Sequence, residues 1–381
     1  MIDQLARMPA YYIARRTGKH VPLPSNLTFS VSYRCNSRCV TCNVWRKRVA
    51  DFTLEEYERT FHKLKRSLRW VTFSGGEPFL RPDLPEIVLA CARICQPTII
   101  NIPTNGLLVE RVANGVERIA REAPKTKLVI NLSLDGIGEE HDRIRGVPGN
   151  YVKLRESYAA LRAINAPNLT VGIHTVISQH NINRFGDIRD HVRSAINPDS
   201  FITELAEERV ELDTIGLDIT PPVEQYAAVV DRLVDDIDAE PASGVAGIAQ
   251  AFRRHYYQVA RQTLLEQRQI LPCYAGVASG HIAPNGDVWT CCIRAEPIGS
   301  LRETDYDLRP IWGGARADTL RGSIKRGECY CPLANAAYSS MLNDPPSLAR
   351  VGVNFGRLQM RRLARRKATA DDPLHGWGDG L

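Results

Sequence analysis

Residues 33–45 read YRCNSRCVTCNVW and contain three cysteines, Cys35, Cys39 and Cys42, with the spacing C-x3-C-x2-C. The apolar run at residues 27–33 that leads into them is typical of a β-strand. Three thiolates on one loop can hold three corners of a 4Fe-4S cluster and leave the fourth iron open to a small molecule. On spacing alone, a zinc site or a set of free thiols are the alternatives.

A second motif, Gly75-Gly76-Glu77-Pro78, follows the apolar run at residues 70–74. Two glycines let the backbone approach a ligand closely, and the Glu77 carboxylate can accept hydrogen bonds from an amine or from hydroxyls. On its own, this motif is typical of an ordinary strand-to-helix turn. Its position after the cysteine triplet favours a ligand site instead.

Together, the two motifs resemble those of the radical S-adenosylmethionine (SAM) superfamily. The resemblance implies that the three cysteines ligate a 4Fe-4S cluster and that the turn from Gly75 to Pro78 holds the methionine amine of SAM. It also implies further SAM contacts at two later strand ends, where this chain has Thr104 and Ser133.

The first half of the chain alternates β-rich runs with helical patterns, which is typical of parallel strands joined by crossover helices. We therefore expect an α/β fold, a partial (β/α)6 barrel of the radical SAM type related to the TIM barrel. Both motifs and both later polar positions follow predicted strands, where ligands gather in such folds. The strands are predicted near residues 27–33, 70–74, 98–103, 127–134, 169–177 and 200–205, and the helices at residues 53–68, 107–122, 151–164 and 183–196.

A second set of cysteines lies in the last third of the chain: Cys273, Cys291, Cys329 and Cys331. Asn285-Gly286 between two apolar runs predicts a two-residue hairpin, which would bring the first two of these cysteines together. Four thiolates can saturate an iron-sulfur cluster, and a zinc ribbon is the alternative. Cys292 could replace Cys291 as the ligand.

This segment resembles the SPASM and twitch extensions of radical SAM enzymes. The spacing of Cys273, Gly286 and Cys291 matches their opening pattern, whereas the cysteines for a second auxiliary cluster are missing. The resemblance implies one auxiliary 4Fe-4S cluster, as in the twitch type. The expected organisation is an N-terminal extension (1–26), the barrel (27–209), a helical connector (210–272), a twitch/SPASM-like auxiliary-cluster domain (273–340) and a basic C-terminal tail (341–381).

Composition bears on location and partners. The chain has 381 residues, of which 44% are hydrophobic, and ten cysteines without a secretory signal, which predicts a soluble protein of the reducing cytoplasm. Residues 357–367 carry six basic residues and no acid. This tail could contact an anionic membrane surface peripherally, and its lack of interleaved aromatic residues argues against nucleic acid.

The resemblance implies that the chain cleaves SAM reductively and uses the 5′-deoxyadenosyl radical to abstract hydrogen from a substrate. A reductase such as flavodoxin or ferredoxin would supply the electron. Peptide-modifying members of the family often carry a leader-binding domain before the barrel, whereas only about two dozen residues precede the first strand of this sequence. We therefore expect a small molecule, a sugar or a lipid as the substrate, in an oxidation or a bond-forming step. The alternatives are a radical SAM peptide (RiPP) maturase and a non-enzymatic iron-sulfur or zinc protein.

Two more segments could face the substrate, with His174 on the fifth predicted strand and Glu204 on the sixth. His174 is more typical of a packed or capping histidine than of an acid-base catalyst. Glu207 and Arg209, at the end of the sixth segment, are more typical of a solvated or ion-paired edge than of a substrate contact.

Overall fold

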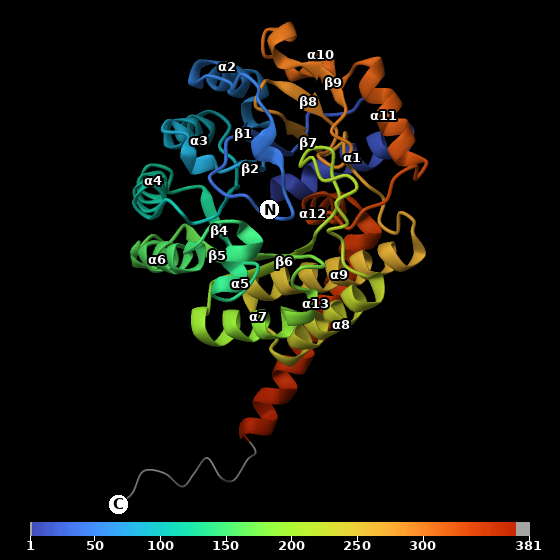
Figure 1. Ribbon diagram of the computed structural model, residues 1–381. Coiled ribbons are helices and arrows are strands. Elements are labelled where there is room, and N and C mark those ends of the chain that lie inside the picture. The colour runs from blue at the N-terminus through green and yellow to red at the C-terminus, as the bar shows by residue number, and fades with distance from the viewer. Residues whose placement is uncertain (1, 371–381) are drawn as a thin grey trace, which may run out of the picture.

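Nine strands form a single sheet that curves through the molecule (Figure 1). The structure is a computed structural model that describes residues 2–370, with side chains described for residues 6–364. The strand order is β6-β5-β4-β3-β2-β1-β7-β8-β9, and the first six strands pair in parallel with their sequence neighbours. The strands are β1 (Asn26–Ser32), β2 (Trp70–Gly75), β3 (Ile99–Thr104), β4 (Lys127–Ser133), β5 (Leu169–Ile177), β6 (Ser200–Leu205), β7 (Ser279–Ile282), β8 (Asp287–Trp289) and β9 (Pro297–Ser300).

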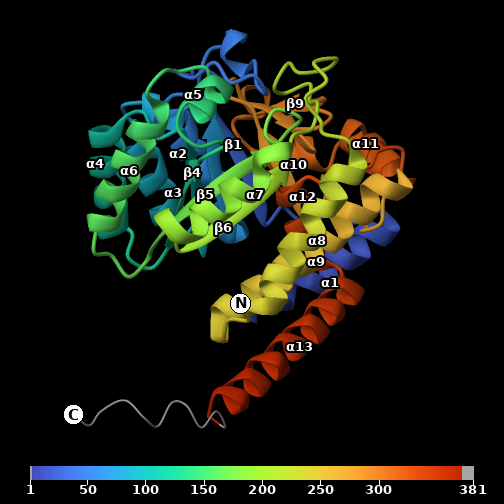
Figure 2. The ribbon, with the colours of Figure 1, turned by 60° about the horizontal axis from the view of Figure 1, so that its bottom comes forward.

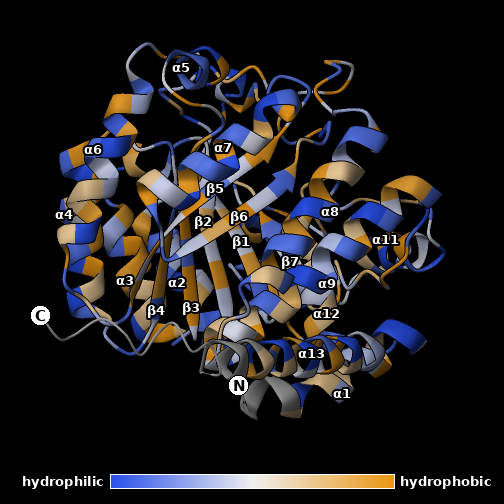
Figure 3. Cartoon of the chain, turned by 90° about the horizontal axis from the view of Figure 1, so that it is seen from below, coloured by the Kyte–Doolittle hydropathy of each residue, from blue (hydrophilic) through white to orange (hydrophobic). Residues whose placement is uncertain are grey.

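The parallel half of the sheet confirms the predicted partial barrel. Each pair of its neighbouring strands is connected through helices, as parallel pairing requires, and these helices cover the outer face of the sheet (Figure 1). In Figure 3 the central strands are mostly hydrophobic, whereas α4 and α6 alternate between hydrophobic and hydrophilic faces. The helices of this half are α2 (Leu54–Leu64), α3 (Leu84–Ile94), α4 (Val109–Glu122), α5 (Glu139–Arg145), α6 (Asn150–Ala163) and α7 (Phe185–His191).

The main core lies between the sheet and these helices. Phe29 on β1 stacks on Phe73 of β2, with ring centroids 5.7 Å apart, and meets Phe61 of α2 edge to face at 5.6 Å. All three side chains are fully buried, as are Cys91 on α3 and Cys95 at its C-terminal end. Every residue of β1 is buried, because this strand lies in the middle of the sheet.

The sheet continues into the C-terminal part of the chain through β7, which pairs in parallel with β1. This pairing joins the cysteine loop after β1 to the segment that carries the second cysteine set. The remaining helices pack beside this side of the sheet, and α9 lies alongside both α8 and α13 (Figure 2). They are α1 (Ile2–Thr17), α8 (Val223–Ala239), α9 (Gly244–Glu266), α10 (Leu308–Trp312), α11 (Ala315–Lys325), α12 (Ala334–Asn343) and α13 (Pro345–Ala370).

The predicted hairpin exists, but its turn is longer than two residues. β7 and β8 pair antiparallel, and the N–H of Ala283 donates to the carbonyl of Asp287 at 2.8 Å across a three-residue loop. Gly286 takes a left-handed φ of +89°, the conformation that closes loops of this length. A Cβ at Gly286 would overlap the ring of Phe52, which packs against the loop.

The basic C-terminal segment lies on α13, which packs against α9 and α12 and then projects from the rest of the chain (Figure 1). Arg361 on this helix forms an ion pair with Asp238 of α8 at 2.8 Å. The last eleven residues of the predicted tail, 371–381, lie outside the described residues. Among the helices that the structure describes, none combines the length and the hydrophobicity that a membrane span needs.

Candidate functional site

Backbone contacts hold the cysteine loop against the Gly75–Pro78 turn. The N–H of Gly76 donates to the carbonyl of Ser32 at 2.8 Å, and the N–H of Glu77 donates to the carbonyl of Arg34 at 2.9 Å. A Cβ on either glycine would overlap these same carbonyls, and Gly75 also has a φ of +125°. The two glycines are therefore required for the close approach of the two loops.

The Glu77 carboxylate is buried and fixes the ends of two strands. It accepts hydrogen bonds from the hydroxyl of Thr104 at 2.9 Å and from the N–H groups of Asn105 at 2.8 Å and Phe79 at 3.1 Å. Burial raises the pKa of Glu77, and these donors oppose that shift. Because a carboxylate has about four acceptor sites, most of this one is used within the chain, and only a small part remains for a ligand amine.

Asn105 ties the end of β3 to the cysteine loop. Its side-chain amide donates to Asn36 Oδ1 at 2.7 Å and to Ser37 Oγ at 3.0 Å, both in the loop between the first two cysteines. Ser133 lies at the end of β4, opposite His174 in the register. The predicted SAM contacts of Gly75, Gly76, Glu77, Pro78, Thr104 and Ser133 thus lie at neighbouring strand ends, and their roles stay predictions.

A buried ion pair next to the cysteine loop was missed by the sequence analysis. Arg145 at the end of α5 contacts Asp135 at 3.0 Å, and these side chains are 12% and 2% exposed. The N–H groups of Arg38 and Val40 in the cysteine loop donate to carbonyls of α5 at 3.0 and 2.9 Å. No motif marks Arg145 as special, because only the packing of α5 against the loop brings it near the thiols.

The first cysteine set gathers in one place. Burial raises the pKa of Cys42 to about 12, and the neighbouring Cys39 and Cys35 thiols raise it further. Burial also raises the pKa of Cys35 to about 11, whereas Arg145 acts in the opposite direction. A bound cation must therefore displace protons that the free thiols hold at neutral pH.

The second cysteine set also comes together. Burial raises the pKa of Cys273 to about 12, and the nearby Cys291 and Cys329 thiols contribute to this shift. Burial likewise raises the pKa of Cys331, with contributions from Cys273 and Cys291 among others. Cys292 points elsewhere: its ligand atom lies with those of Glu211 and His281. The structure thus favours Cys291 over Cys292 as the fourth member of the set.

Neither cysteine set is as compact as the four ligands of a single zinc ion. Zinc held by thiolates at about 2.3 Å in a tetrahedron brings the sulfurs to within about 3.8 Å of one another. Within the described residues, neither cysteine set forms a group whose ligand atoms all lie within 4.8 Å. The free thiols of each set are the ligand type that holds 4Fe-4S clusters.

Charged side chains lie between the two cysteine sets, in the segment that follows β6. Asn43, next to Cys42, donates its N–H to the carbonyl of Leu212 at 2.8 Å. Glu207 and Arg209 form an ion pair at 3.5 Å, with side chains only 12% and 15% exposed. The sequence indicated a solvated or ion-paired edge here; the pair exists, but it is mostly buried.

His174 and Glu204 form a second pair in the same region. His174 Nε2 on β5 lies 3.3 Å from a carboxylate oxygen of Glu204 on β6. The side chain of Glu204 also accepts the N–H of Ala334 at 3.1 Å, which connects the barrel to α12. These contacts place charged groups on the last two barrel strands, where the sequence predicted residues that face a substrate.

Comparisons with known proteins agree with this geometry. Residues 29–192 match the family model described as the radical SAM superfamily. The chain is 29% identical over 164 residues to Fe-coproporphyrin III synthase of Methanosarcina barkeri, which covers 41% of this chain and 38% of that protein. It is 21% identical over 323 residues to the antilisterial bacteriocin subtilosin biosynthesis protein AlbA of Bacillus subtilis, with 81% of this chain and 66% of AlbA covered.

Among solved structures, the chain is similar to Streptococcus suis SuiB bound to the precursor peptide SuiA. The TM-score is 0.57 at 17% sequence identity, with 81% of this chain and 70% of that chain covered. At this identity the likeness concerns the fold, and it extends beyond the barrel. The chain spans less than two thirds of the length of the two curated relatives above.

Proposed function

Because residues 29–192 make this chain a member of the radical SAM superfamily, we propose that it is an enzyme that cleaves SAM reductively and modifies a peptide with the resulting radical. The observation that carries the proposal is the packing of three free thiols beside a Gly-Gly turn at the ends of β1 and β2. The family's cofactors are a 4Fe-4S cluster and SAM, and the donor set and its spacing fit them.

In this proposal, Cys35, Cys39 and Cys42 hold the cluster, and the turn from Gly75 to Pro78 holds the amino end of SAM. When bound, the cluster supplies the electron that splits SAM into methionine and a 5′-deoxyadenosyl radical. The residues of the chain hold the cysteine loop and the turn in position. Glu77 fixes the turn against β3, and Arg145 provides a positive charge next to the thiols.

The second cysteine set holds one auxiliary 4Fe-4S cluster through Cys273, Cys291, Cys329 and Cys331. All four thiols would be ligands, so that no iron is left for a small molecule. The burial of these thiols and their electrostatic influence on one another support this assignment. A group of this kind can accept the second electron of a net two-electron oxidation of the substrate.

We favour a peptide as the substrate because the similarities to AlbA and to SuiB extend over most of the chain. The match to AlbA, which is named for bacteriocin biosynthesis, covers 81% of the chain and so extends beyond the barrel. SuiB, whose fold covers the same share, is bound to a precursor peptide. A small-molecule substrate is supported by the match to Fe-coproporphyrin III synthase, but this match covers only 41% of the chain. The shared C-terminal part thus favours a peptide over the small molecule, sugar or lipid expected from the sequence.

The proposal is tested under anaerobic conditions with dithionite-reduced protein. Wild-type protein is expected to form 5′-deoxyadenosine from SAM, whereas Cys39→Ala should form none. Incubation with short peptides encoded beside its gene, followed by mass spectrometry, is expected to show loss of hydrogen from one of them. Absence of 5′-deoxyadenosine from the wild type would remove the enzyme proposal. SAM cleavage without any modified peptide, together with turnover of a small molecule, would instead support a small-molecule substrate. The reductase partner and a cytoplasmic location belong to the same proposal.

A further inference from the structure

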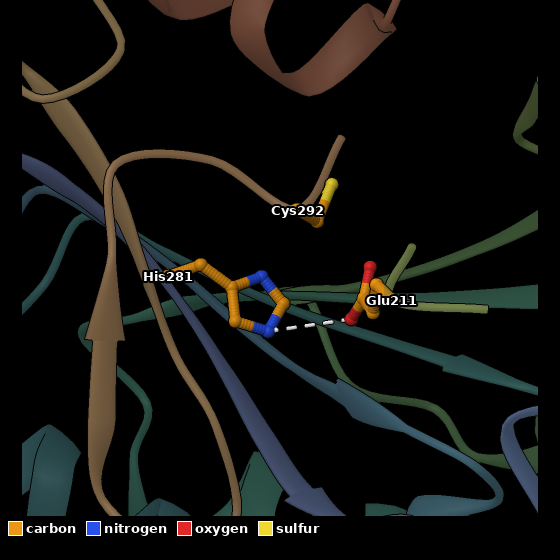
Figure 4. Close-up of side chains that lie close together, drawn as sticks. All are labelled: Glu211, His281 and Cys292. Carbon is orange, nitrogen blue, oxygen red and sulfur yellow. Dashed lines mark ion pairs between the residues drawn. The ribbon is translucent and has the colours of Figure 1, made fainter. Parts of the chain in front are cut away.

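A third group of metal-ligand side chains lies apart from the two predicted cysteine sets. It consists of Glu211 in the segment after β6, His281 on β7 and Cys292 after β8, with ligand atoms that all lie within 4.8 Å of one another. His281 Nε2 is 3.3 Å from Glu211 Oε1. Figure 4 shows the three side chains converging from separate segments. No other group of three such side chains is as compact within the part of the chain that the structure describes.

The geometry of this group is fixed by its surroundings. His281 and Glu211 are 4% and 7% exposed, and Cys292 is half-buried. The hydroxyl of Ser30 lies 2.9 Å from His281 Nε2 and donates to Glu211 Oε1 at 3.3 Å. The imidazole ring stacks on Trp289, with centroids 4.9 Å apart and an interplanar angle of 19°. Stacking and hydrogen bonding thus hold the ring of His281 and the carboxylate of Glu211 in fixed positions.

The charges of the region also suit a cation. A metal-bound glutamate and a metal-bound cysteine are a carboxylate and a thiolate, so together they supply two negative charges to a cation. The nearby Arg209 interacts with Cys292 and Glu211 and also pairs with Glu207 at 3.5 Å, so Glu207 offsets part of its positive charge. A divalent cation would balance the two negative charges of its ligands.

We propose that Glu211, His281 and Cys292 bind one divalent cation of the zinc class. One oxygen, one nitrogen and one sulfur donor suit zinc, which takes all three in proteins. Three protein ligands leave one tetrahedral position open, as in catalytic zinc sites. The cation would then be a Lewis acid that binds an oxygen atom of the substrate.

The position of the site supports this role. Glu211 is followed by Leu212, whose carbonyl binds the backbone next to Cys42, and Cys292 follows Cys291 of the second set. The cation would therefore lie between the two proposed clusters, where a substrate of the proposed reaction has to be held. Only this substrate role rests on the proposed function; binding of the cation does not.

The test measures metal in the intact protein with both clusters reconstituted, after addition of one equivalent of Zn²⁺ and gel filtration. We expect about one zinc per chain in addition to the irons, and a zinc absorption edge that shows one sulfur together with nitrogen and oxygen neighbours. His281→Ala should lower the zinc affinity at least a hundredfold and keep iron and sulfide unchanged. His174→Ala, which changes a histidine paired with Glu204, should keep both metals.

Three results would overturn the site: no zinc after gel filtration, zinc with sulfur neighbours alone, or full zinc retention by His281→Ala. Glu211→Gln and Cys292→Ser provide a second pair of variants in case His281→Ala fails to fold, which its iron content and circular dichroism reveal; each should lose zinc. Formation of 5′-deoxyadenosine is measured in the same preparations. A variant that loses zinc but still cleaves SAM has lost only the zinc site. A wild type that binds zinc but cleaves no SAM refutes only the radical function.

Discussion

The guanidinium of Arg145 lies 3.0 Å from the carboxylate of Asp135, and both side chains are mostly buried beside the loop that carries the first three cysteines. Asp135 also accepts the N–H of Val176 at 2.8 Å, so the pair connects β5 to α5 as well. The ion pair thus connects α5, which contacts the cysteine loop, to the barrel. Its charge acts on the thiols, because Arg145 lowers the pKa values that burial raises.

Replacing Arg145 by Met is expected to destabilise the protein by about 3–5 kcal/mol, because it leaves the buried Asp135 carboxylate without its partner. Thermal unfolding followed by circular dichroism measures this loss. Arg143→Met is the matched control, since Arg143 lies on the same helix but is exposed, and it should unfold at the wild-type temperature. Equal stability of the two variants would show that the pair contributes little.

Gly76→Ala is expected to reduce formation of 5′-deoxyadenosine at least tenfold. The added Cβ would overlap the carbonyl of Arg34 and push the cysteine loop away from the turn, at a cost of about 1–3 kcal/mol. Gly352→Ala on α13 is the control, because nothing lies near its Cβ position and its backbone is helical. A Gly76→Ala protein with wild-type SAM cleavage would contradict the required close approach.

Iron analysis distinguishes Cys291 from Cys292. Two 4Fe-4S clusters predict about eight irons per chain. Cys291→Ser is expected to lower this to about four, since Cys291 lies with Cys273 and Cys329, whereas Cys292→Ser should keep about eight. The opposite outcome for these two variants would make Cys292 the ligand.

His141 gives a testable pH dependence of stability. Burial and the nearby Arg145 lower the pKa of His141 to about 4 from the usual 6.5. The folded state therefore binds fewer protons than the unfolded state between these values, and stability is lost as the pH falls from 6.5 toward 4.

The loss from this one residue is at most about 1.4 kcal/mol per pH unit. Denaturant unfolding at pH 7 and pH 5 measures it, and His141→Gln should show a smaller decrease than the wild type. Other buried histidines affect both proteins equally, so the difference between them isolates His141. Equal decreases in the two proteins would mean that His141 keeps its usual pKa when folded.

The fold was largely readable from local patterns. Six β-rich runs separated by helical stretches predicted the parallel half of the sheet, and β1 to β6 lie within one or two residues of the predicted runs. The prediction succeeded because parallel pairing and right-handed crossovers leave few ways to arrange such units. The hairpin at Asn285-Gly286 was predicted with a turn one residue too short, because a turn length depends on the pairing that closes it.

The sequence by itself determined the barrel, the two cysteine sets and the Gly-Gly turn, because each depends on residues that are close together in the chain or follow a regular pattern. Only the tertiary structure decided that β7 pairs with β1, that Arg145 lies beside the thiols, and that Glu211, His281 and Cys292 meet. Most of these contacts join segments tens of residues or more apart, and no local periodicity records them. They arise when the faces of separate elements are packed together, which fixes distances that spacing along the chain leaves open.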